Sequence, residues 1–374
     1  MPAQFRGGAT MKKANSSFPT ETPRRILLLK GYSAGVGDLL RSSVAWRALQ
    51  EKFPQAQLHL WFLTQDPGSP SEQLIARHHL LAGFRISDKR TRGLQGWKKL
   101  LSDAKEIAVQ LRPDLIVDFE PNGLRTSLLA LLMGRWSRAA TVGIAQNPGR
   151  RCFYTRSSPS TKIYAAKHGM TLPLEFCERD FVALAALGIE RRGAAIELKE
   201  TDEGRAFRAR LCEELGGDST RPLLGLNIGC GTPDATVKRP GLDLLAGLVG
   251  ELQRRHGFAV VLTGAQYERE INREFISRLH ATGPVVDLAG RTDMLELAGA
   301  IAACRLFISS DSGPYHMAVA LRVPTLAIFK FPNPPHYHRH AWVECVVAPD
   351  ANFLPVALEA AKRLLKIAPT PLPA

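Results

Sequence analysis

The sequence predicts an α/β protein with two doubly wound domains, each built on a parallel sheet, that face each other across a cleft. Three observations predict this fold class. The 374 residues suit two domains of ordinary size. Short apolar runs alternate with helical patterns along the chain, which is typical of parallel sheets covered by helices. This alternation starts twice, at residues 25 and 222, and each first strand runs into a glycine-containing loop.

The expected elements follow the same order in both halves. The first half has expected strands at 25–30, 57–64 and 115–119 and a helix at 39–53; the second has strands at 222–228, 259–263 and 305–309 and a helix at 242–256. Short apolar runs bounded by glycine or proline indicate buried parallel strands. The resulting scheme has a disordered tail at 1–23, domains at 24–187 and 222–350 with a charged linker at 188–221 between them, and a C-terminal helix and tail at 351–374.

Charge and composition narrow the class of partner. The chain has 49 Lys and Arg against 35 Asp and Glu, a formal net charge of +14, which favours an anionic partner such as nucleic acid, a phosphorylated small molecule or an acidic membrane surface. It contains no nucleic-acid recognition module, so we expect no nucleic-acid role. The sequence shows no run of 18 apolar residues, no apolar signal-peptide core and no C-x-x-C pair. We therefore expect a cytoplasmic protein.

The loop after the first strand places three glycines and an aspartate before a helix. A P-loop needs Gly-Lys-Ser/Thr after its last glycine, whereas Gly37 is followed by Asp38, and Leu40 stands where a dinucleotide fingerprint needs its third glycine. The carboxylate of Asp38 would also repel a phosphate. Two roles stay open for Asp38 from its position alone: it caps the helix, or it is presented as a general base.

Two loops of the second half carry residue types that suit an anion. Residues 227–240 combine glycines with Thr232, Thr236 and Lys238, which suits a pyrophosphate, although a solvated loop is equally compatible with this composition. Residues 306–321 run from a strand through Asp-Ser-Gly-Pro into a helix of small residues. The N-terminus of that helix would attract an anion, with Ser312 as its cap and His316 one turn further on.

These segments together resemble glycosyltransferase family 9, the heptosyltransferases of lipopolysaccharide core assembly. The resemblance rests on the Gly-x-Gly-Asp turn, the Thr-Val-Lys-Arg-Pro loop at 236–240, and above all residues 311–329, and it extends over about 25–348. It implies a GT-B fold. It also implies an inverting transfer of a sugar from a nucleotide, usually ADP-heptose, to a hydroxyl of a lipid-linked glycan.

The resemblance also implies roles for individual residues. Asp38 matches the proposed catalytic base, with Gly35 and Gly37 in the acceptor loop. Lys238 matches a basic residue near the donor phosphates, with Thr232 or Thr236 beside it. The stretch 264–268, which ends at Glu268, resembles the part that contacts the nucleoside. The donor-holding signature corresponds to Asp311, Ser312, Gly313 and His316. No metal and no cofactor beyond the nucleotide-sugar substrate are expected, and the C-terminal helix is expected to cross back to the first domain.

Two features depart from the family pattern. Lys330 stands where the family usually has a glycine, which puts the usual donor geometry in doubt. Three histidines then alternate at His336, His338 and His340, and this spacing suits either a metal site or a proline-broken surface loop.

Basic residues crowd the first domain, which would face the acceptor in a GT-B enzyme. We expect them to meet a phosphorylated glycan or glycolipid, or an anionic membrane surface, unless they are only solvated helix faces. We expect a monomer. Two alternatives stay open: another nucleotide-sugar enzyme of this fold, such as an epimerase, and a non-catalytic nucleotide-binding module.

Overall fold

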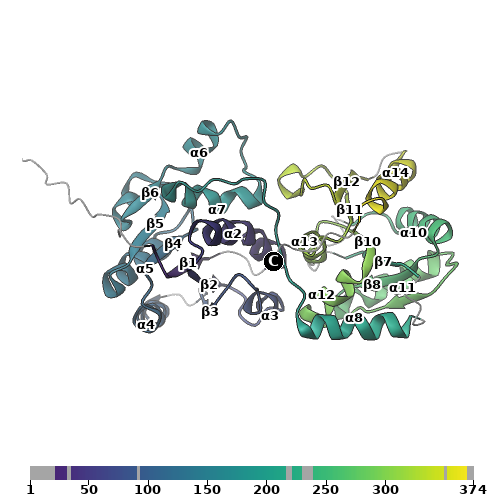
Figure 1. Cartoon of the computed structure of the whole chain (residues 1–374), viewed down its shortest axis with the longest axis horizontal. Helices are drawn as coiled ribbons and strands as arrows, with labels where there is room; N and C mark the ends of the chain where they lie inside the picture. Colours follow the sequence, from purple (N-terminus) through teal and green to yellow (C-terminus); the bar gives the residue numbers. More distant parts are fainter. Residues whose placement is uncertain are drawn as a thin grey trace, which may run out of the picture.

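The computed structural model describes residues 22–31, 35–90, 93–215, 221–229, 239–348 and 352–368. These residues form two lobes, each built around one six-stranded parallel sheet with helices packed against it (Figure 1). The strand orders are β3-β2-β1-β4-β5-β6 in the first lobe and β12-β11-β10-β7-β8-β9 in the second. The expected α/β class with two parallel sheets is confirmed.

The first lobe is built from short apolar strands that are buried by their helices. Its strands are β1 (Arg25–Lys30), β2 (Gln57–Thr64), β3 (Gly83–Asp88), β4 (Leu115–Asp118), β5 (Ala140–Ile144) and β6 (Arg156–Ser158). Its helices are α1 (Val36–Arg41), α2 (Ser43–Lys52), α3 (Ser71–Ala76), α4 (Gly93–Leu111), α5 (Leu124–Ser137), α6 (Thr161–Lys167) and α7 (Phe176–Leu184). The central strands β1 and β4 are apolar and almost wholly buried, as strands covered on both faces must be.

The second lobe repeats this plan. Its strands are β7 (Leu223–Asn227), β8 (Ala259–Thr263), β9 (Val285–Asp287), β10 (Cys304–Ser309), β11 (Thr325–Phe329) and β12 (Val343–Val347). Its helices are α8 (Asp202–Glu214), α10 (Leu242–His256), α11 (Arg269–Arg278), α12 (Met294–Ala302), α13 (Gly313–Ala320) and α14 (Phe353–Leu365). Among the helices of the described residues, none has the length and hydropathy that a bilayer span requires.

Three expectations about individual helices change. The helix expected at 39–53 is two helices, α1 and α2, which meet at Ser42. The expected linker contains α8, which packs on α12. The expectation that the C-terminal helix crosses back is wrong. Its apolar face, with Phe353 and Leu364, is buried in the core of the second lobe, and α14 contacts β10, β11, β12 and α10 (Figure 1).

The chain passes between the lobes through a segment held by Glu197. Arg47 in α2 donates two hydrogen bonds to the Glu197 carboxylate, at 2.8 and 2.7 Å, and His79 Nε2 lies 3.1 Å from it. The next residue, Leu198, donates its N–H to the carbonyl oxygen of Ala320 in α13. Burial alone would raise the pKa of Glu197, but the hydrogen bonds from Arg47 and His79 outweigh burial and lower this pKa to about 2. The segment therefore joins α2 of one lobe to α13 of the other.

Glu197→Gln is expected to lower the free energy of unfolding by about 2 kcal/mol at neutral pH, because it leaves the Arg47 guanidinium without its counter-charge. The folded pKa is depressed, so this contribution is complete above the ordinary value of 4.5 and is lost as the pH falls toward about 2. Urea unfolding at several pH values measures it. Glu270→Gln, at a side chain 83% exposed in the pair with Arg273, is the matched control and should change stability little. Equal stability of the two variants would contradict this role of Glu197.

Candidate active site between the lobes

Asp38 lies in the first turn of α1, directly after the glycine-rich loop. The N-cap position belongs to Gly35, so Asp38 is not the cap of this helix. Its Oδ1 lies 3.5 Å from Nη1 of Arg41, one turn further along α1. Arg41 is buried, and burial lowers its pKa while Cys177, Asp38 and neighbouring groups act in the opposite direction. The carboxylate of Asp38 is thus held by a guanidinium from its own helix.

Arg41 also reaches the second lobe. Its Nη2 lies 2.9 Å from Nε2 of His316, and Nδ1 of His316 lies 2.8 Å from Nε2 of His338. A guanidinium only donates, so Nε2 of His316 must accept, which leaves the ring proton on Nδ1 to be donated to His338. Burial, followed by the charge of Arg41, lowers the pKa of His338 well below its usual value, consistent with a neutral acceptor ring. One directed chain of hydrogen bonds therefore crosses from α1 to the second lobe.

The close approach of the two lobes at this point depends on Gly37. A β-carbon at Gly37 would overlap the ring of His316, and a β-carbon at Gly313 would press on Val36. Gly35 has an extended conformation with φ of −64°, which other residues also adopt. Of the two glycines expected in the acceptor loop, Gly37 is required by packing between α1 and α13. Residues 32–34 of this loop lie outside the described residues.

The residues of the expected donor-holding signature lie together where β10 ends and α13 begins. His336 Nδ1 lies 3.0 Å from Oδ2 of Asp311, and His316 Nε2 lies 3.9 Å from Oδ1 of the same carboxylate. Ser312 occupies the N-cap position of α13, but the expectation that its side chain caps the helix is wrong. Its hydroxyl donates instead to Oδ1 of Asn227 at 3.1 Å, which ties the end of β7 to the start of α13.

Glu268 lies buried beside the ends of β7 and β8. Its Oε2 accepts the N–H of Ala265 at 2.7 Å. Any β-carbon at Gly229 would overlap its carboxylate, so the side chain passes directly beside the backbone of that glycine. The carboxyl ends of β7, β8 and β10 thus bring Glu268, Asn227 and Asp311 to one edge of the second sheet, where parallel sheets bind ligands. The other expected donor residues, Thr232, Thr236 and Lys238, lie outside the described residues.

A pocket of about 340 Å³ opens beside Asp38 in the first lobe. Its polar lining includes Asp38, Arg41, Lys30 and Arg179. Lys30 is paired with Asp180 at 2.8 Å, and the Arg179 guanidinium lies 3.7 Å from the ring centroid of Phe176. The pocket therefore presents carboxylates and cations together, an arrangement that suits a charged or hydroxyl-rich ligand.

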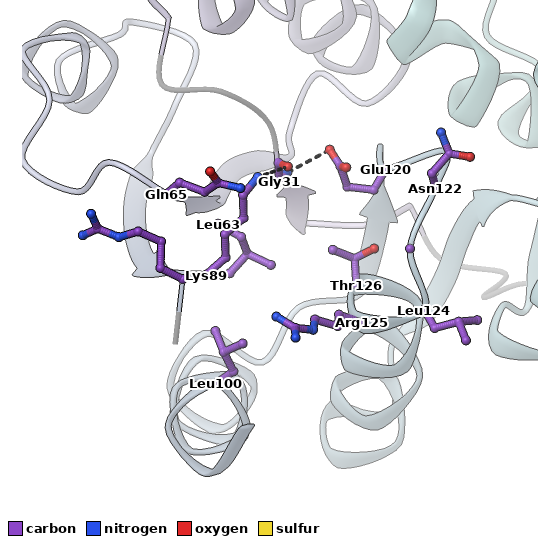
Figure 2. Close-up of a pocket in the computed structure, with 12 residues that line it drawn as sticks. Gly31, Leu63, Gln65, Lys89, Leu100, Glu120, Asn122, Leu124, Arg125 and Thr126 are labelled. Atoms are coloured by element: carbon purple, nitrogen blue, oxygen red, sulfur yellow. Dashed lines mark hydrogen bonds between the residues drawn. The ribbon is translucent and has the colours of Figure 1, made fainter. Parts of the chain in front are cut away.

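A second pocket, of about 830 Å³, lies at the same edge of the first sheet (Figure 2). It is lined by the segments that follow β1, β2, β3 and β4, by Leu100 within α4 and by the start of α5, with the side chains of Lys89 and Arg125 at its border. Lys89 Nζ donates to the carbonyl oxygen of Gly31 at 2.7 Å, and Glu120 Oε1 accepts the N–H of the same glycine at 2.9 Å. Glu120 and Asn122 line both pockets.

The loop at residues 119–123, which lines both pockets, is held in place by a buried hydrogen-bond network. Asp118, at the end of β4, accepts from the Tyr154 hydroxyl at 2.7 Å and from Arg150 at 3.3 Å. Arg150 also donates to the carbonyl oxygen of Pro121. Burial raises the pKa of Asp118 to about 6, although the Tyr154 hydrogen bond opposes it. This network makes residues 119–123 a positioned wall for both pockets.

The structure describes both places where the sequence departs from the family pattern, Lys330 and the histidines at 336–340. Lys330 is not among the described residues with positive φ, so this position does not need a glycine conformation. The three histidines have separate partners. His336 contacts the carboxylate of Asp311, and His338 is hydrogen-bonded to His316. The ring of His340 stacks on that of Trp342, with 4.7 Å between the ring centroids. The described residues contain no group of three side chains placed to hold a metal ion. His338 is buried, so the surface-loop alternative also fails there.

Sequence reasoning missed Arg41, His338 and Arg179. Arg41 stands one helical turn after Asp38, and this spacing could have identified it as a partner of the carboxylate. The contact between Arg41 and His316 joins residues 275 positions apart, and no local pattern predicts it. The sequence shows His338 only as one of three alternating histidines, and this pattern does not predict its contact with His316.

Comparisons with known proteins show which family and which fold this chain is similar to. Residues 187–348 match the model of glycosyltransferase family 9 (heptosyltransferase). The chain is 31% identical over 142 residues to lipooligosaccharide heptosyltransferase 2 of Haemophilus ducreyi, which covers 37% of this chain and 40% of that protein. It is 24% identical over 312 residues to lipopolysaccharide heptosyltransferase 3 of Escherichia coli, 83% of this chain and 84% of that protein. The solved structure of E. coli ADP-heptose lps heptosyltransferase II shares the fold, with a TM-score of 0.64 and 20% identity over 91% of this chain and 98% of that chain. The expected GT-B fold is confirmed.

Gly37→Ala is expected to lower the free energy of unfolding by about 1–3 kcal/mol, because the added methyl group overlaps a His316 ring that two hydrogen bonds hold in place. Urea denaturation followed by circular dichroism measures it. Gly247→Ala in α10 is the matched control, since its methyl group meets nothing within 4 Å. A Gly37→Ala variant as stable as the control would show that α1 and α13 do not pack as described.

Proposed function

We propose that this member of glycosyltransferase family 9 transfers a sugar from a nucleotide sugar held by the second lobe to a hydroxyl group of a glycan held by the first. The observation that carries the proposal is the position of Asp38. Its carboxylate borders the pocket of the first lobe, and its partner Arg41 contacts His316 of the segment that matches the family model. A base beside one pocket and a donor segment directly across from it suit a reaction between two bound substrates.

The proposed donor is ADP-heptose and the proposed acceptor a glycan of the lipopolysaccharide core. Two relatives are named as heptosyltransferases of lipopolysaccharide or lipooligosaccharide, and a similar solved structure is named for ADP-heptose. The cations of the pocket beside Asp38 suit an acceptor that carries phosphate or carboxylate groups. Arg179 and Arg41 both lie against the ring of Phe176, at 3.7 and 4.2 Å from its centroid, which orders two guanidinium groups at one wall.

The proposed reaction is a single displacement with inversion at the anomeric carbon. The carboxylate of Asp38 accepts the proton of the acceptor hydroxyl, and the acceptor oxygen forms a bond to the anomeric carbon. The bond from that carbon to the diphosphate oxygen breaks, and the nucleoside diphosphate leaves with the electron pair. Lys238 and the N-terminal N–H groups of α13 would stabilise the negative charge on the leaving diphosphate, so that no metal ion is needed.

Arg41 has a positioning role in this proposal. It contacts Asp38 on one side and His316 on the other, so the location of the base is tied to the location of the donor segment. His316 in turn lies 3.9 Å from the carboxylate of Asp311. The two substrates are thereby brought together by the same contacts that hold the two lobes together.

The direct test is a screen of nucleotide sugars by thermal shift, followed by transfer assays with core oligosaccharide acceptors in the presence of a chelator. We expect the largest stabilisation with ADP-heptose, and transfer that requires the acceptor and continues without divalent metal. Turnover of the donor without an acceptor would favour an epimerase. Binding of a nucleotide sugar without any turnover would favour a non-catalytic binding module.

Asp38→Asn is expected to lower the rate of transfer by a factor of about 100–10,000, because the amide cannot accept the proton of the acceptor hydroxyl. Affinity for the nucleotide sugar should stay within a few fold, as calorimetry would show. Glu270→Gln, on the exposed face of α11, serves as the control and should keep full activity. A fully active Asp38→Asn enzyme would rule out Asp38 as the base.

Lys238→Ala is expected to weaken binding of the nucleotide sugar by about tenfold or more, since it removes one charge-assisted contact with the diphosphate. Lys362→Ala, on α14, is the matched loss of one exposed positive charge and should leave the affinity unchanged. Titration with the nucleotide sugar and with the free nucleoside diphosphate measures both. An unchanged affinity in Lys238→Ala would count against its role at the donor phosphates.

A further inference from the structure

His336 lies in the segment that follows β11, and its imidazole is oriented by a carboxylate from the neighbouring strand. Nδ1 of His336 lies 3.1 Å from Oδ1 and 3.0 Å from Oδ2 of Asp311, where β10 leads into α13. An ionised carboxylate only accepts hydrogen bonds, so Nδ1 carries a proton and donates to Asp311. The contact with Asp311 therefore fixes both the protonation of Nδ1 and the direction of the ring.

The turn that carries His336 is itself held by hydrogen bonds. The N–H of His336 donates to the carbonyl oxygen of Asn333 at 2.9 Å, and the N–H of Asn333 donates to the hydroxyl of Tyr337 at 3.1 Å. Two residues after His336, the N–H of His338 donates to the hydroxyl of Tyr315, a buried side chain of α13, at 3.0 Å. The imidazole of His336 is thus presented by a turn with a defined position relative to α13.

The ring of His336 also meets the first lobe. It lies edge to face with the ring of Phe176 in α7, with 4.5 Å between the centroids and 74° between the planes. The same Phe176 ring holds the guanidinium groups of Arg41 and Arg179, and all three residues line the pocket beside Asp38. His336 therefore lies where the carboxyl edge of the second sheet meets the pocket of the proposed base.

The second ring nitrogen of His336 is unused. Nε2 has no hydrogen-bond partner among the residues that the structure describes, and the side chain is 22% exposed although Asp311 beside it is only 9% exposed. An imidazole that a carboxylate holds at one nitrogen, and that is open at the other, is an arrangement by which proteins aim the free nitrogen at a ligand. The reaction proposed above assigns no role to this nitrogen.

We propose that Nε2 of His336 contacts the diphosphate of the nucleotide sugar at its sugar end. Because Asp311 supplies a negative charge at Nδ1, the ring can carry a proton on both nitrogens, and Nε2 then donates to the oxygen that joins the diphosphate to the anomeric carbon. When the bond between that carbon and this oxygen breaks, the oxygen keeps the electron pair. The hydrogen bond from Nε2 stabilises the new negative charge, and the proton stays on the imidazole. This assignment rests on the proposed function, which supplies the nucleotide sugar as the ligand.

The test compares His336→Asn with His336→Ala, because an asparagine amide can donate to Asp311 in place of Nδ1 but has no group at the position of Nε2. We expect both variants to bind ADP about tenfold more weakly, as measured by calorimetry. We also expect both to transfer the sugar from saturating ADP-heptose to core oligosaccharide at least about 100-fold more slowly. His280→Asn, at an exposed histidine of the second lobe, is the matched control and should change neither quantity. Thermal unfolding confirms that the variants are folded.

Two results would overturn the proposal while the proposed function stands. One is a His336→Asn enzyme as active as the unmodified chain beside an impaired His336→Ala enzyme, since His336 would then only orient Asp311. The other is full activity and unchanged ADP affinity in both variants. Failure of the proposed function has a different signature: the unmodified chain binds ADP but transfers no sugar, and the loss of ADP affinity in His336→Asn still reports the contact of Nε2. An unmodified chain that binds neither ADP nor ADP-heptose would overturn both proposals.

Discussion

The hydrogen bond between Arg41 and His316 is the contact on which the arrangement of the candidate site depends. It joins α1 of one lobe to α13 of the other, and both partners are buried. Asp38 is held from one side by Arg41, while His316 is held from the other by His338. Gly37 permits the approach, because any larger residue would overlap the His316 ring. The carboxylate of Asp38 and the start of α13 are therefore placed relative to each other by one short chain of polar contacts.

In the proposed reaction, each of the two sheets would hold one substrate. Segments at the carboxyl end of the first sheet form a pocket lined by Asp38, the proposed base, together with Arg41 and Arg179. Loops at the carboxyl end of the second sheet collect Asn227, Glu268 and Asp311 at a separate edge. In the proposed function, the net charge of +14 serves two anions, the donor diphosphate at the second lobe and a charged acceptor at the first.

Local patterns predicted the elements well, and contacts between distant segments poorly. The strands β2 and β8 and the helix α10 have the expected bounds, because apolar runs and helical periodicity are local properties of the sequence. Asp38 and His316 were both expected at a site, but nothing in either segment indicates that Arg41 links them. Likewise, the apolar face of α14 predicts a helix without saying which lobe it covers, and it covers the second. Ser312 binds Asn227 rather than its own helix for the same reason: its partner comes from another strand.

In the proposed reaction, one base acts across the junction of the lobes in a single displacement. Nuclear magnetic resonance of the anomeric centre in the product, compared with the same centre in the nucleotide-sugar donor, shows whether the displacement is single. A single displacement gives the opposite anomeric configuration in the product, because the acceptor oxygen attacks the face opposite the leaving diphosphate. A product that retains the donor's configuration would contradict it.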